Sequence, residues 1–467
     1  MDLGFDLSSK DNAVRKTLKH LEKAGAELAE AFFMATKTAE VTIRNSEIFA
    51  ENVMVDVGVG FRAVARGNCV GFACTNLMDS EKDMLETGEK ALAIATLSAP
   101  ILGFALPSPR KVTKLKALLD KRVNEARVED AVDVARRMLE AAELKDKRVT
   151  AKDGRVVFLS VHRSVVNSLG VDLEDQGTWA YAYLGGSGSQ SGEVTPTCYD
   201  FDLRRDAGLQ PEKVGEKVAE MVIAQFGAEK AESFEGPVIF GPEAVSYQLF
   251  DALASALSAE RVLANGTPWA GKIGEPVASQ PLTVSDNSIL DGGFASRSFD
   301  DEGYPCQETL LISDGILTSF LHNATTAKRL NMENTGNASR TSGGLDLVKQ
   351  IIGNGYRAKP EVYPSNLVIK TGKKTQQELA SELKKGVLVE SMSGFVQAGS
   401  GLVSAQLARA HSIENGEIQA PLKGGMISGI TFDWFKHVVE AGSDAKRFAN
   451  SVVPSLSVEK ARIVGAR

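Results

Sequence analysis

The 467-residue chain carries 53 lysines and arginines against 60 aspartates and glutamates, and 43% of its residues are hydrophobic. Its net charge of −7 argues against a general electrostatic affinity for nucleic acid. No apolar stretch reaches membrane-spanning length, and residues 1–12 show no secretory signal. Four cysteines without metal-like spacing fit reduced thiols. We therefore expect a cytoplasmic globular protein of about three domains, with neither nucleic acid nor membrane as a partner.

The first segment is predicted to combine helices and strands. Val14, Leu18 and Leu21 have helical spacing, so residues 11–24 are predicted to form an amphipathic helix. Residues 40–66 are rich in Val, Ile and Phe, which favours strands. Prolines at 100, 107 and 109 indicate a linker. A first α+β domain is therefore expected over residues 1–108.

The middle segment is predicted to repeat this mixture. Apolar periodicity predicts a helix over residues 128–144, and residues 156–161 have the pattern of a strand. Residues 185–192 are rich in Gly and Ser but lack the Gly-Lys-Ser/Thr ending of a phosphate-binding loop, so a flexible hairpin tip is expected. A helix over residues 211–226 completes a middle α+β domain, residues 109–232, and leaves residues 233–467 as a β-rich third domain.

The stretch from residue 291 to 340 is the most informative part of the chain. Apolar runs at 308–312 and 316–320 flank Ser313-Asp314-Gly315, which predicts a β-hairpin. Polar loops lie on both sides of this hairpin. They are either the rims of a substrate site or tight turns in which side chains bond to backbone amides. The candidate substrate-binding residues are Asp300, Asp301, Glu302, Asn334, Thr335, Asn337 and Arg340.

Three groups of residues carry a resemblance to a known family. They are Gly58-Val59-Gly60-Phe61-Arg62 with Gly71 to Asn76, the hairpin region, and Ile413 to Ile418 with Pro421. In this order they resemble the TldD/PmbA family, often labelled modulators of DNA gyrase and understood as zinc-dependent peptidases that work in pairs. The resemblance implies an α+β fold, with N-terminal mixed α/β domains followed by a C-terminal antiparallel, barrel-like β domain.

The same resemblance addresses which member of the pair this chain is similar to. TldD-type subunits carry a His-Glu-x-x-x-His motif, and a catalytic zinc needs about three protein ligands. The equivalent segment here begins with Pro242 and ends with Tyr247, so both histidines are replaced and only Glu243 remains. Glu243 is then either an ordinary carboxylate in the first turn of a helix or an unrecognised metal or substrate contact. The chain thus resembles the TldE/PmbA partner subunit, with no metal or cofactor of its own and zinc expected in a TldD-type partner.

Three functional hypotheses follow. The first is a TldE-like subunit of a cytosolic metallopeptidase complex that acts on small or unfolded peptides. The second is a homodimeric, non-catalytic peptide-binding protein. The third is a peptidase active alone through an unrecognised site, for which Cys306 and His322 are a conceivable nucleophile pair.

Overall fold

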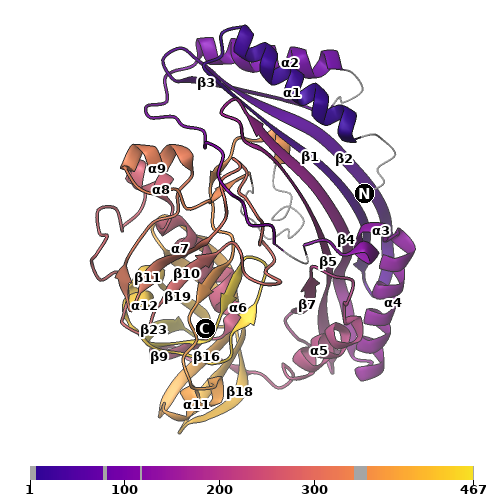
Figure 1. Cartoon of the computed structure of the whole chain (residues 1–467). Helices are drawn as coiled ribbons and strands as arrows, with labels where there is room; N and C mark the ends of the chain where they lie inside the picture. The colour runs from indigo at the N-terminus through magenta and orange to yellow at the C-terminus, as the bar shows by residue number, and fades with distance from the viewer. Residues whose placement is uncertain (1–6, 77–80, 116–117, 341–354, 466–467) are drawn as a thin grey trace.

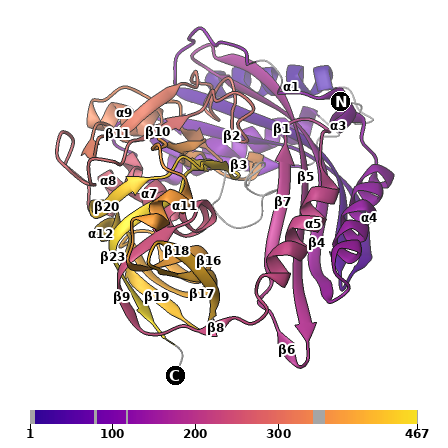
Figure 2. The same ribbon diagram turned by 90° about the horizontal axis from the view of Figure 1, so that it is seen from below.

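A computed structural model describes residues 7–76, 81–115, 118–340 and 355–465. The chain forms two packed parts, which we call the sheet region (residues 7–226) and the barrel region (residues 229–465). The sheet region is a strongly curved β-sheet, and the barrel region lies against its concave side (Figures 1 and 2). The predicted α+β fold is confirmed.

The curved sheet is antiparallel and built from long strands. Its order is β3-β2-β1-β4-β5, and both β6 and β7 pair with β5. The strands are β1 (Leu28–Arg44), β2 (Glu47–Ala65), β3 (Cys69–Thr75), β4 (Val149–Asn167), β5 (Asp172–Gln190), β6 (Glu193–Val194) and β7 (Cys198–Arg204). Because β1 pairs with β4 from Glu30↔Asn167 to Arg44↔Asp153, one sheet continues across residue 108. The division there into two domains stays a prediction.

Helices cover the convex face of this sheet at both ends (Figure 1). At one end, Leu18 and Leu21 share a core with Phe33 and Phe61. The helices are α1 (Leu7–Lys23) and α2 (Glu81–Leu97) at this end, and α3 (Lys121–Glu125), α4 (Val128–Lys145) and α5 (Pro211–Ile223) at the other. The helices predicted over residues 11–24, 128–144 and 211–226 are therefore confirmed, each to within a few residues.

The Gly/Ser segment differs from its prediction. Residues 185–190 belong to strand β5, and only Ser191 and Gly192, both with positive φ, form the turn into β6. The glycines have a packing role, because a Cβ at Gly185 would lie 2.4 Å from the Tyr199 ring and one at Gly186 would lie 2.7 Å from Val218. The segment therefore ends in the predicted hairpin, between β5 and β6, but residues 185–188 form a closely packed strand rather than a flexible tip.

The barrel region contains the predicted β-barrel. Five strands close on themselves in the order β16-β9-β23-β19-β17-β16, and the β16–β9 pair alone among them is parallel. These strands are β9 (Phe234–Phe240), β16 (Lys385–Gln397), β17 (Leu402–Glu414), β19 (Met426–Ile430) and β23 (Leu456–Val464). Short strands β8 (Glu229–Lys230), β18 (Glu417–Lys423) and β20 (Val438–Ala441) extend the same sheet.

A second sheet and several short helices complete the barrel region. The sheet has the order β12-β11-β10-β15-β22-β21. Its strands are β10 (Val284–Asn287), β11 (Glu308–Ser313), β12 (Ile316–Leu317), β15 (Leu367–Ile369), β21 (Lys446–Arg447) and β22 (Ser451–Val453), and β13 (Ala338–Ser339) pairs separately with β14 (Glu361–Val362). The helical segments are α6 (Pro242–Ala244), a π-turn (Val245–Leu249), α7 (Phe250–Ala256), α8 (Ala259–Leu263), α9 (Ala324–Leu330), a 3₁₀ turn (Gly355–Arg357), α11 (Gln376–Ser381) and α12 (Thr431–Lys436).

The predicted hairpin is present between β11 and β12. Ile312 pairs with Leu317, and the turn residues Asp314 and Gly315 have φ of 48° and 80°. Two consecutive residues with positive φ are what a tight two-residue hairpin turn requires, and Asp-Gly meets this requirement at low cost.

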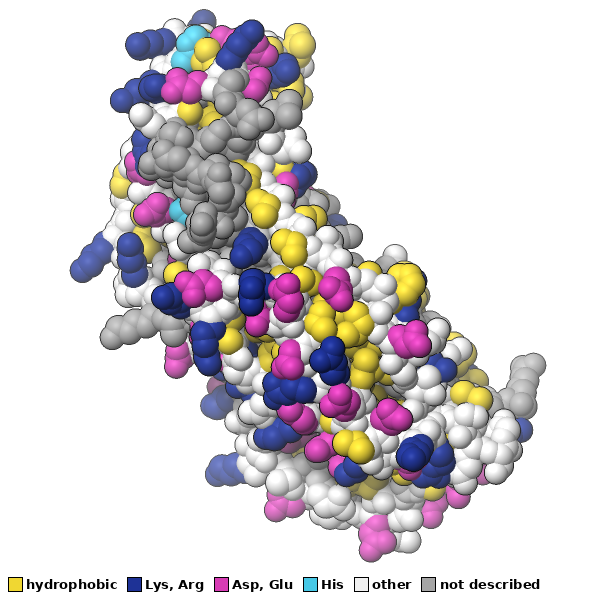
Figure 3. Space-filling model, turned by 90° about the vertical axis from the view of Figure 1, so that its right-hand side faces the viewer, with side chains coloured by type: hydrophobic (Ala, Val, Ile, Leu, Met, Phe, Trp, Pro, Cys, Tyr) yellow, Lys and Arg dark blue, Asp and Glu magenta, His cyan; other side chains and the backbone are white. Residues whose placement is uncertain are grey.

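The two regions meet in an apolar contact. Phe32 and Met34 of β1 and Val157 of β4 pack with Phe299 and Tyr356 of the barrel region. On one outer face of the molecule, acidic and basic side chains are interspersed among hydrophobic ones (Figure 3). Within the described residues, none of the helices has the length and apolarity needed to span a membrane.

Candidate functional site

Glu243 lies in the first turn of a helical run, as the sequence predicts. Gly241 precedes it, and Pro242 occupies the first helical position, where the fixed φ of proline is favourable and its missing N–H costs nothing. The run continues through a π-turn (Val245–Leu249) into α7. Such π-turns interrupt the regular helical spacing of side chains. The spacing between the positions of Pro242 and Tyr247 is therefore not that of a regular α-helix.

An arginine occupies the space in front of Glu243. Arg409 of strand β17 forms an ion pair with the Glu243 carboxylate, and its second terminal nitrogen lies 3.2 Å from Glu390 of β16. The Arg409 side chain is only 8% exposed. Burial raises the pKa of Glu243, and the charge of Arg409 opposes that rise. Burial lowers the pKa of Arg409, but the two carboxylates outweigh this effect and raise it. The guanidinium thus joins two carboxylates inside the protein.

The residues around Glu243 do not fit a zinc ion. Pro242 has no ligating atom, and the Tyr247 ring packs edge-on against Phe448 at 5.5 Å between centroids. The Glu243 carboxylate is already paired with Arg409. Zinc needs several His, Cys, Asp or Glu ligands that are free to converge on it. Across the described part of the chain, no group of three or more such side chains is arranged to hold a metal.

A pocket of about 700 Å³ surrounds this ion pair, and we call it the Glu243 pocket. It lies between α5 and β7 of the sheet region and the barrel strands β16 and β17. His411 approaches Glu390 at 3.9 Å, and burial raises the pKa of Asp200 to about 6. Its other charged lining residues are Lys217, Glu220, Asp444 and Lys446. The pocket is therefore large, polar and rich in charges of both signs.

The candidate residues of the first polar loop are buried. Asp300, Asp301 and Glu302 are each at most 5% exposed. The Asp300 carboxylate accepts hydrogen bonds from the backbone amides of Glu302, Tyr304 and Ala338, at 2.9–3.0 Å. Burial raises the pKa of Asp300, and the neighbouring Glu302 carboxylate raises it further. This geometry is that of a tight turn held by a side chain.

Asp301, Glu302 and Arg340 belong to a group of ionised side chains that joins the two regions. Glu302 accepts from Arg62 at 2.9 Å, and Glu30 accepts from Arg62 at 2.5 Å and from Arg340 at 2.7 Å. Asp301 accepts from Arg297 at 2.9 Å and from the backbone amide of Arg340 at 2.7 Å. We call Glu30, Arg62, Arg297, Asp301, Glu302 and Arg340 the buried ionic cluster.

The remaining candidates also have internal partners. Thr335 donates to Asn337 at 2.6 Å, and Asn337 donates to the buried Asp286 at 2.7 Å. Asn334 is half-buried and accepts from the amide of Gly336 at 3.0 Å. The structure thus brings Asp301, Glu302 and Arg340 together in one cluster and leaves the other candidates in turns or local networks.

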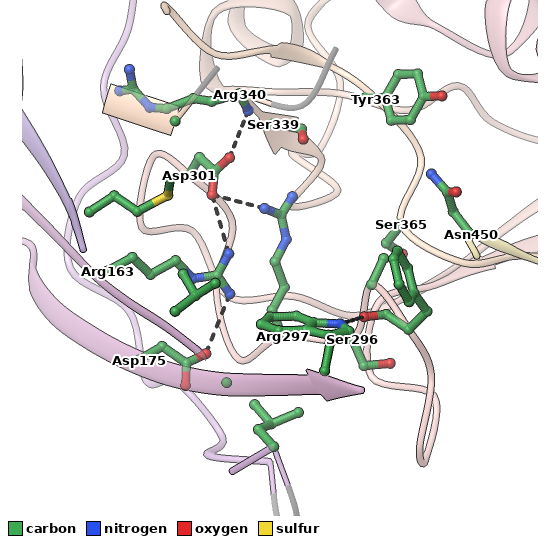
Figure 4. A pocket seen from close by; sticks show the side chains of 18 of the residues that line it. Arg163, Asp175, Ser296, Arg297, Asp301, Ser339, Arg340, Tyr363, Ser365 and Asn450 are labelled. Carbon is green, nitrogen blue, oxygen red and sulfur yellow. Dashed lines mark hydrogen bonds and ion pairs between the residues drawn. The ribbon is translucent and has the colours of Figure 1, made fainter. Parts of the chain in front are cut away.

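A second cavity lies where the concave face of the sheet meets the barrel region (Figure 4). Its volume is about 60 Å³, and we call it the Arg205 cavity. Of the predicted residues, Asp301 and Arg340 line it. Sequence reasoning missed its other ionisable lining residues, which are Arg163, Asp175, Arg205 and Arg297. In Figure 4, Arg163 lies between Asp175 and Asp301 and is 3.5 Å from each.

Cys306 and His322 do not have the properties of a nucleophile pair. Burial raises the pKa of the Cys306 thiol to about 12, and this thiol bonds to the Gly336 carbonyl at 3.6 Å. Burial lowers the pKa of His322 to about 4. An active thiolate requires a lowered thiol pKa and a base in contact with it. Here the thiol pKa is raised, and within the described part of the chain neither ring nitrogen of His322 has a hydrogen-bond partner.

One sequence signal could have identified Arg409. In strand β17 the buried residues Val403, Ala405 and Leu407 alternate with exposed ones, and the alternation continues to the buried Arg409, next to the core residue Ala410. A charged residue at an apolar inward position of a strand needs a partner. The partner of Arg409, Glu243, is 166 residues away in the chain, so sequence spacing could not show that the two residues form a pair.

Comparisons with known proteins place this geometry in context. Family models match in order: PmbA/TldA metallopeptidase domain 1 over residues 29–95, the central domain over residues 121–226 and the C-terminal domain over residues 233–465. Metalloprotease PmbA of Escherichia coli O157:H7 is 25% identical over 491 residues and covers 100% of both chains. The metalloprotease TldD homolog of Buchnera aphidicola is also 25% identical, over 93% of this chain and 89% of that one.

Among solved structures, TldE from Thermococcus kodakarensis is similar over 97% of this chain and 100% of that chain, with a TM-score of 0.86 and 26% identity. Sequence identity to PmbA and to a TldD homolog is equal. Overall similarity therefore does not distinguish the two kinds of subunit, and the residues around Glu243 have to do so.

Proposed function

This chain belongs to the PmbA/TldA metallopeptidase family, and from that premise we propose that it is a TldE-type subunit that works with a zinc-bearing, TldD-type partner. In the complex, the partner supplies the metal that activates water for peptide hydrolysis. This chain supplies part of the enclosure in which small or unfolded peptides are held.

The observation that carries the proposal is the position of Arg409. A guanidinium between Glu243 and Glu390 places a fixed positive charge beside the one residue retained from the His-Glu-x-x-x-His pattern. A second cation at the same carboxylate would be repelled, and neither Pro242 nor the packed Tyr247 ring offers it a ligand. This geometry supports a subunit whose own pocket performs no metal chemistry.

The contacts of the buried ionic cluster favour a structural role for the predicted polar loops over substrate binding. The charges of Asp301, Glu302 and Arg340 are paired with charged partners within the chain. We propose that they fix the barrel region against the sheet. The rest of the Glu243 pocket, with about 700 Å³ and charges of both signs, is a better candidate for contact with a peptide, while the Glu243 carboxylate itself is taken up by Arg409.

The test compares zinc content and peptide hydrolysis for this chain alone, a TldD-type subunit of the same organism alone, and their mixture. We expect this chain alone to be inert and free of stoichiometric zinc, and the mixture to cleave unfolded peptides.

A pair of matched variants makes the test specific. Glu243→Gln in this chain is expected to leave hydrolysis by the mixture within about twofold, because the group does not touch the reacting atoms. The same change at the motif glutamate of the partner is expected to abolish hydrolysis. Loss of activity on Glu243→Gln, or cleavage by this chain alone, would overturn the proposal.

A further inference from the structure

Arg205 is a buried cation with no carboxylate partner among the described residues. It follows strand β7, and the residue is 8% exposed. Its terminal nitrogens donate to the carbonyl oxygens of Phe294 at 3.0 Å and Leu118 at 3.2 Å. Its guanidinium lies over the Trp179 ring at 3.8 Å, and its Nε has no hydrogen-bond acceptor. The contacts orient the group without neutralising it.

Three other buried arginines of this molecule each have a carboxylate partner. Arg62 contacts Glu30 and Glu302, Arg297 contacts Asp301, and Arg340 contacts Glu30. A buried charge without a counterion is costly, and proteins normally pair it. The cost at Arg205 shows in its pKa, which is lowered to about 9 by burial and by the neighbouring Arg163, although the Asp175 carboxylate acts in the opposite direction. At neutral pH the group is still charged.

The Arg205 cavity offers space for a compensating group. About 60 Å³ exceeds the space needed for one water molecule several-fold, so a small polyatomic ion fits. Four arginines line the cavity (Arg163, Arg205, Arg297 and Arg340), against two carboxylates, Asp175 and Asp301. Arg163 is shared between those carboxylates at 3.5 Å, a long distance for an ion pair. Since Arg340 is paired with Glu30 and Arg297 with Asp301, Arg205 is the lining arginine that has no paired carboxylate among the described residues.

Neutral polar groups complete the wall. Ser296, Ser365, Tyr363 and Asn450 line the cavity and are visible in Figure 4. The Tyr363 hydroxyl and the Asn450 amide can donate to an oxyanion without adding charge, whereas the hydroxyls of Ser296 and Ser365 already donate to the Leu290 carbonyl and to Asp286. Gly177 also lines the cavity, and a Cβ there would lie 2.6 Å from a terminal nitrogen of Arg205. The sheet is thus shaped to admit the guanidinium at this point.

We propose that the Arg205 cavity binds a small oxyanion, of the size of a carboxylate or phosphate group, with Arg205 as its principal contact. A guanidinium presents a planar fork of donors that suits such oxygens, and the free Nε of Arg205 can take part. The oxyanion is either a free ion or the carboxylate at the end of a bound peptide. The proposal does not depend on a metal or on a partner subunit.

The experiment measures thermal unfolding of the purified full-length chain against low millimolar acetate or phosphate, with chloride at matched ionic strength as the reference. Wild type is expected to show a saturable rise in Tm. Arg205→Gln is expected to weaken the apparent affinity by about tenfold or more, with Arg205→Lys in between. Arg137→Gln is the matched control, since Arg137 is an exposed arginine paired with Glu212. It should respond like wild type.

Two short peptides of one sequence, with a free or an amidated C-terminus, distinguish the sources. If only the free acid binds, and more tightly than acetate, the ligand is a peptide end; equal binding of acetate and free acid indicates a free ion. An identical response of wild type and Arg205→Gln would overturn the proposal, because it would reflect a general salt effect. Should Arg205→Gln not fold, calorimetric titration of wild type decides. Absence of saturable binding of both ions would overturn the proposal equally.

Discussion

Two buried arginines, Arg409 and Arg205, face pockets of this molecule and are compensated in opposite ways. Arg409 in the Glu243 pocket contacts two carboxylates of its own chain, while Arg205 contacts only carbonyl oxygens and an aromatic ring. The first pocket is about 700 Å³ and the second about 60 Å³. The larger pocket is therefore the one whose buried arginine is already paired with carboxylates of the chain.

From this difference we infer that the charges around Glu243 are balanced by residues of the chain, whereas the charge of Arg205 calls for a bound anion. An account based on motif alone would look for a ligand only at Glu243, because that is where the family motif lies. The balance of charge directs attention to Arg205 instead. Three substitutions test how far this distinction holds, beginning with the region that encloses the smaller cavity.

The largest effect is expected from Glu30→Gln in the buried ionic cluster. Glu30 is fully buried and accepts from both Arg62 and Arg340. Removing its charge leaves Arg340 without a paired carboxylate and Arg62 with Glu302 alone, so we expect a loss of about 3–5 kcal/mol in unfolding free energy. Urea denaturation followed by tryptophan fluorescence measures it. The control is Glu89→Gln, an exposed partner of His20, with an expected cost below about 0.5 kcal/mol. Equal costs would show that the cluster does not hold the two regions together.

Arg409→Met is expected to have an intermediate effect. It leaves Glu243 and Glu390 adjacent without their common cation, but both carboxylates are partly exposed, at 27% and 34%. We expect a cost of about 1–3 kcal/mol near pH 8. Loss of the cation raises the pKa of Glu243 further, so its proton is bound more tightly in the folded state. The cost should therefore shrink as the pH is lowered towards 5. A cost independent of pH would indicate lost packing rather than lost charge.

The smallest effect is expected from Asp200→Asn in the Glu243 pocket. The Asp200 pKa is raised from 3.8 to about 6 by burial, so the folded state binds its proton more tightly than the unfolded state does. Its contribution to stability is full below pH 3.8 and is lost as the pH rises through about 6. Because Asp200 is partly exposed and solvent screens its charge, we expect only about 1 kcal/mol of the roughly 3 kcal/mol that the shift implies: the variant should have the higher unfolding free energy at pH 7 and about the same value as wild type at pH 4. Tm values of the variant and of wild type, measured from pH 4 to pH 7, test this. A Tm difference that stays constant over this range would contradict the prediction.

Local patterns predicted much of the fold. Asp314-Gly315 between apolar runs identified a hairpin, and helical spacing of Val14, Leu18 and Leu21 identified α1, because these signals lie within a few residues of one another. The barrel came from the family resemblance, since strand patterns alone do not say which strands close the ring. The glycines at 185–190 misled the prediction because the side chains that fill the space beside them come from other elements.

The sites were less accessible to sequence reasoning. Glu243 was identified by motif, but its partner comes from a barrel strand far along the chain, and pairing them requires the closed sheet. Arg205 had no signal at all, since a single arginine after a strand is usually at the surface. Its burial follows from the docking of the barrel region on the concave face, a tertiary event that no local pattern encodes.

Arg409 also bears on how such a subunit would be produced in the cell. The cation that joins β17 to the start of the Glu243 helix is part of the polypeptide and is present as soon as both segments are synthesised. If the proposed function holds, maturation of this pocket would draw nothing from the cell's metal supply, and chelators would have nothing to extract from it. Under zinc limitation, a pair built from this chain and a zinc-bearing partner would lose its activity through the partner alone, while this half persists as a folded scaffold ready for reassembly.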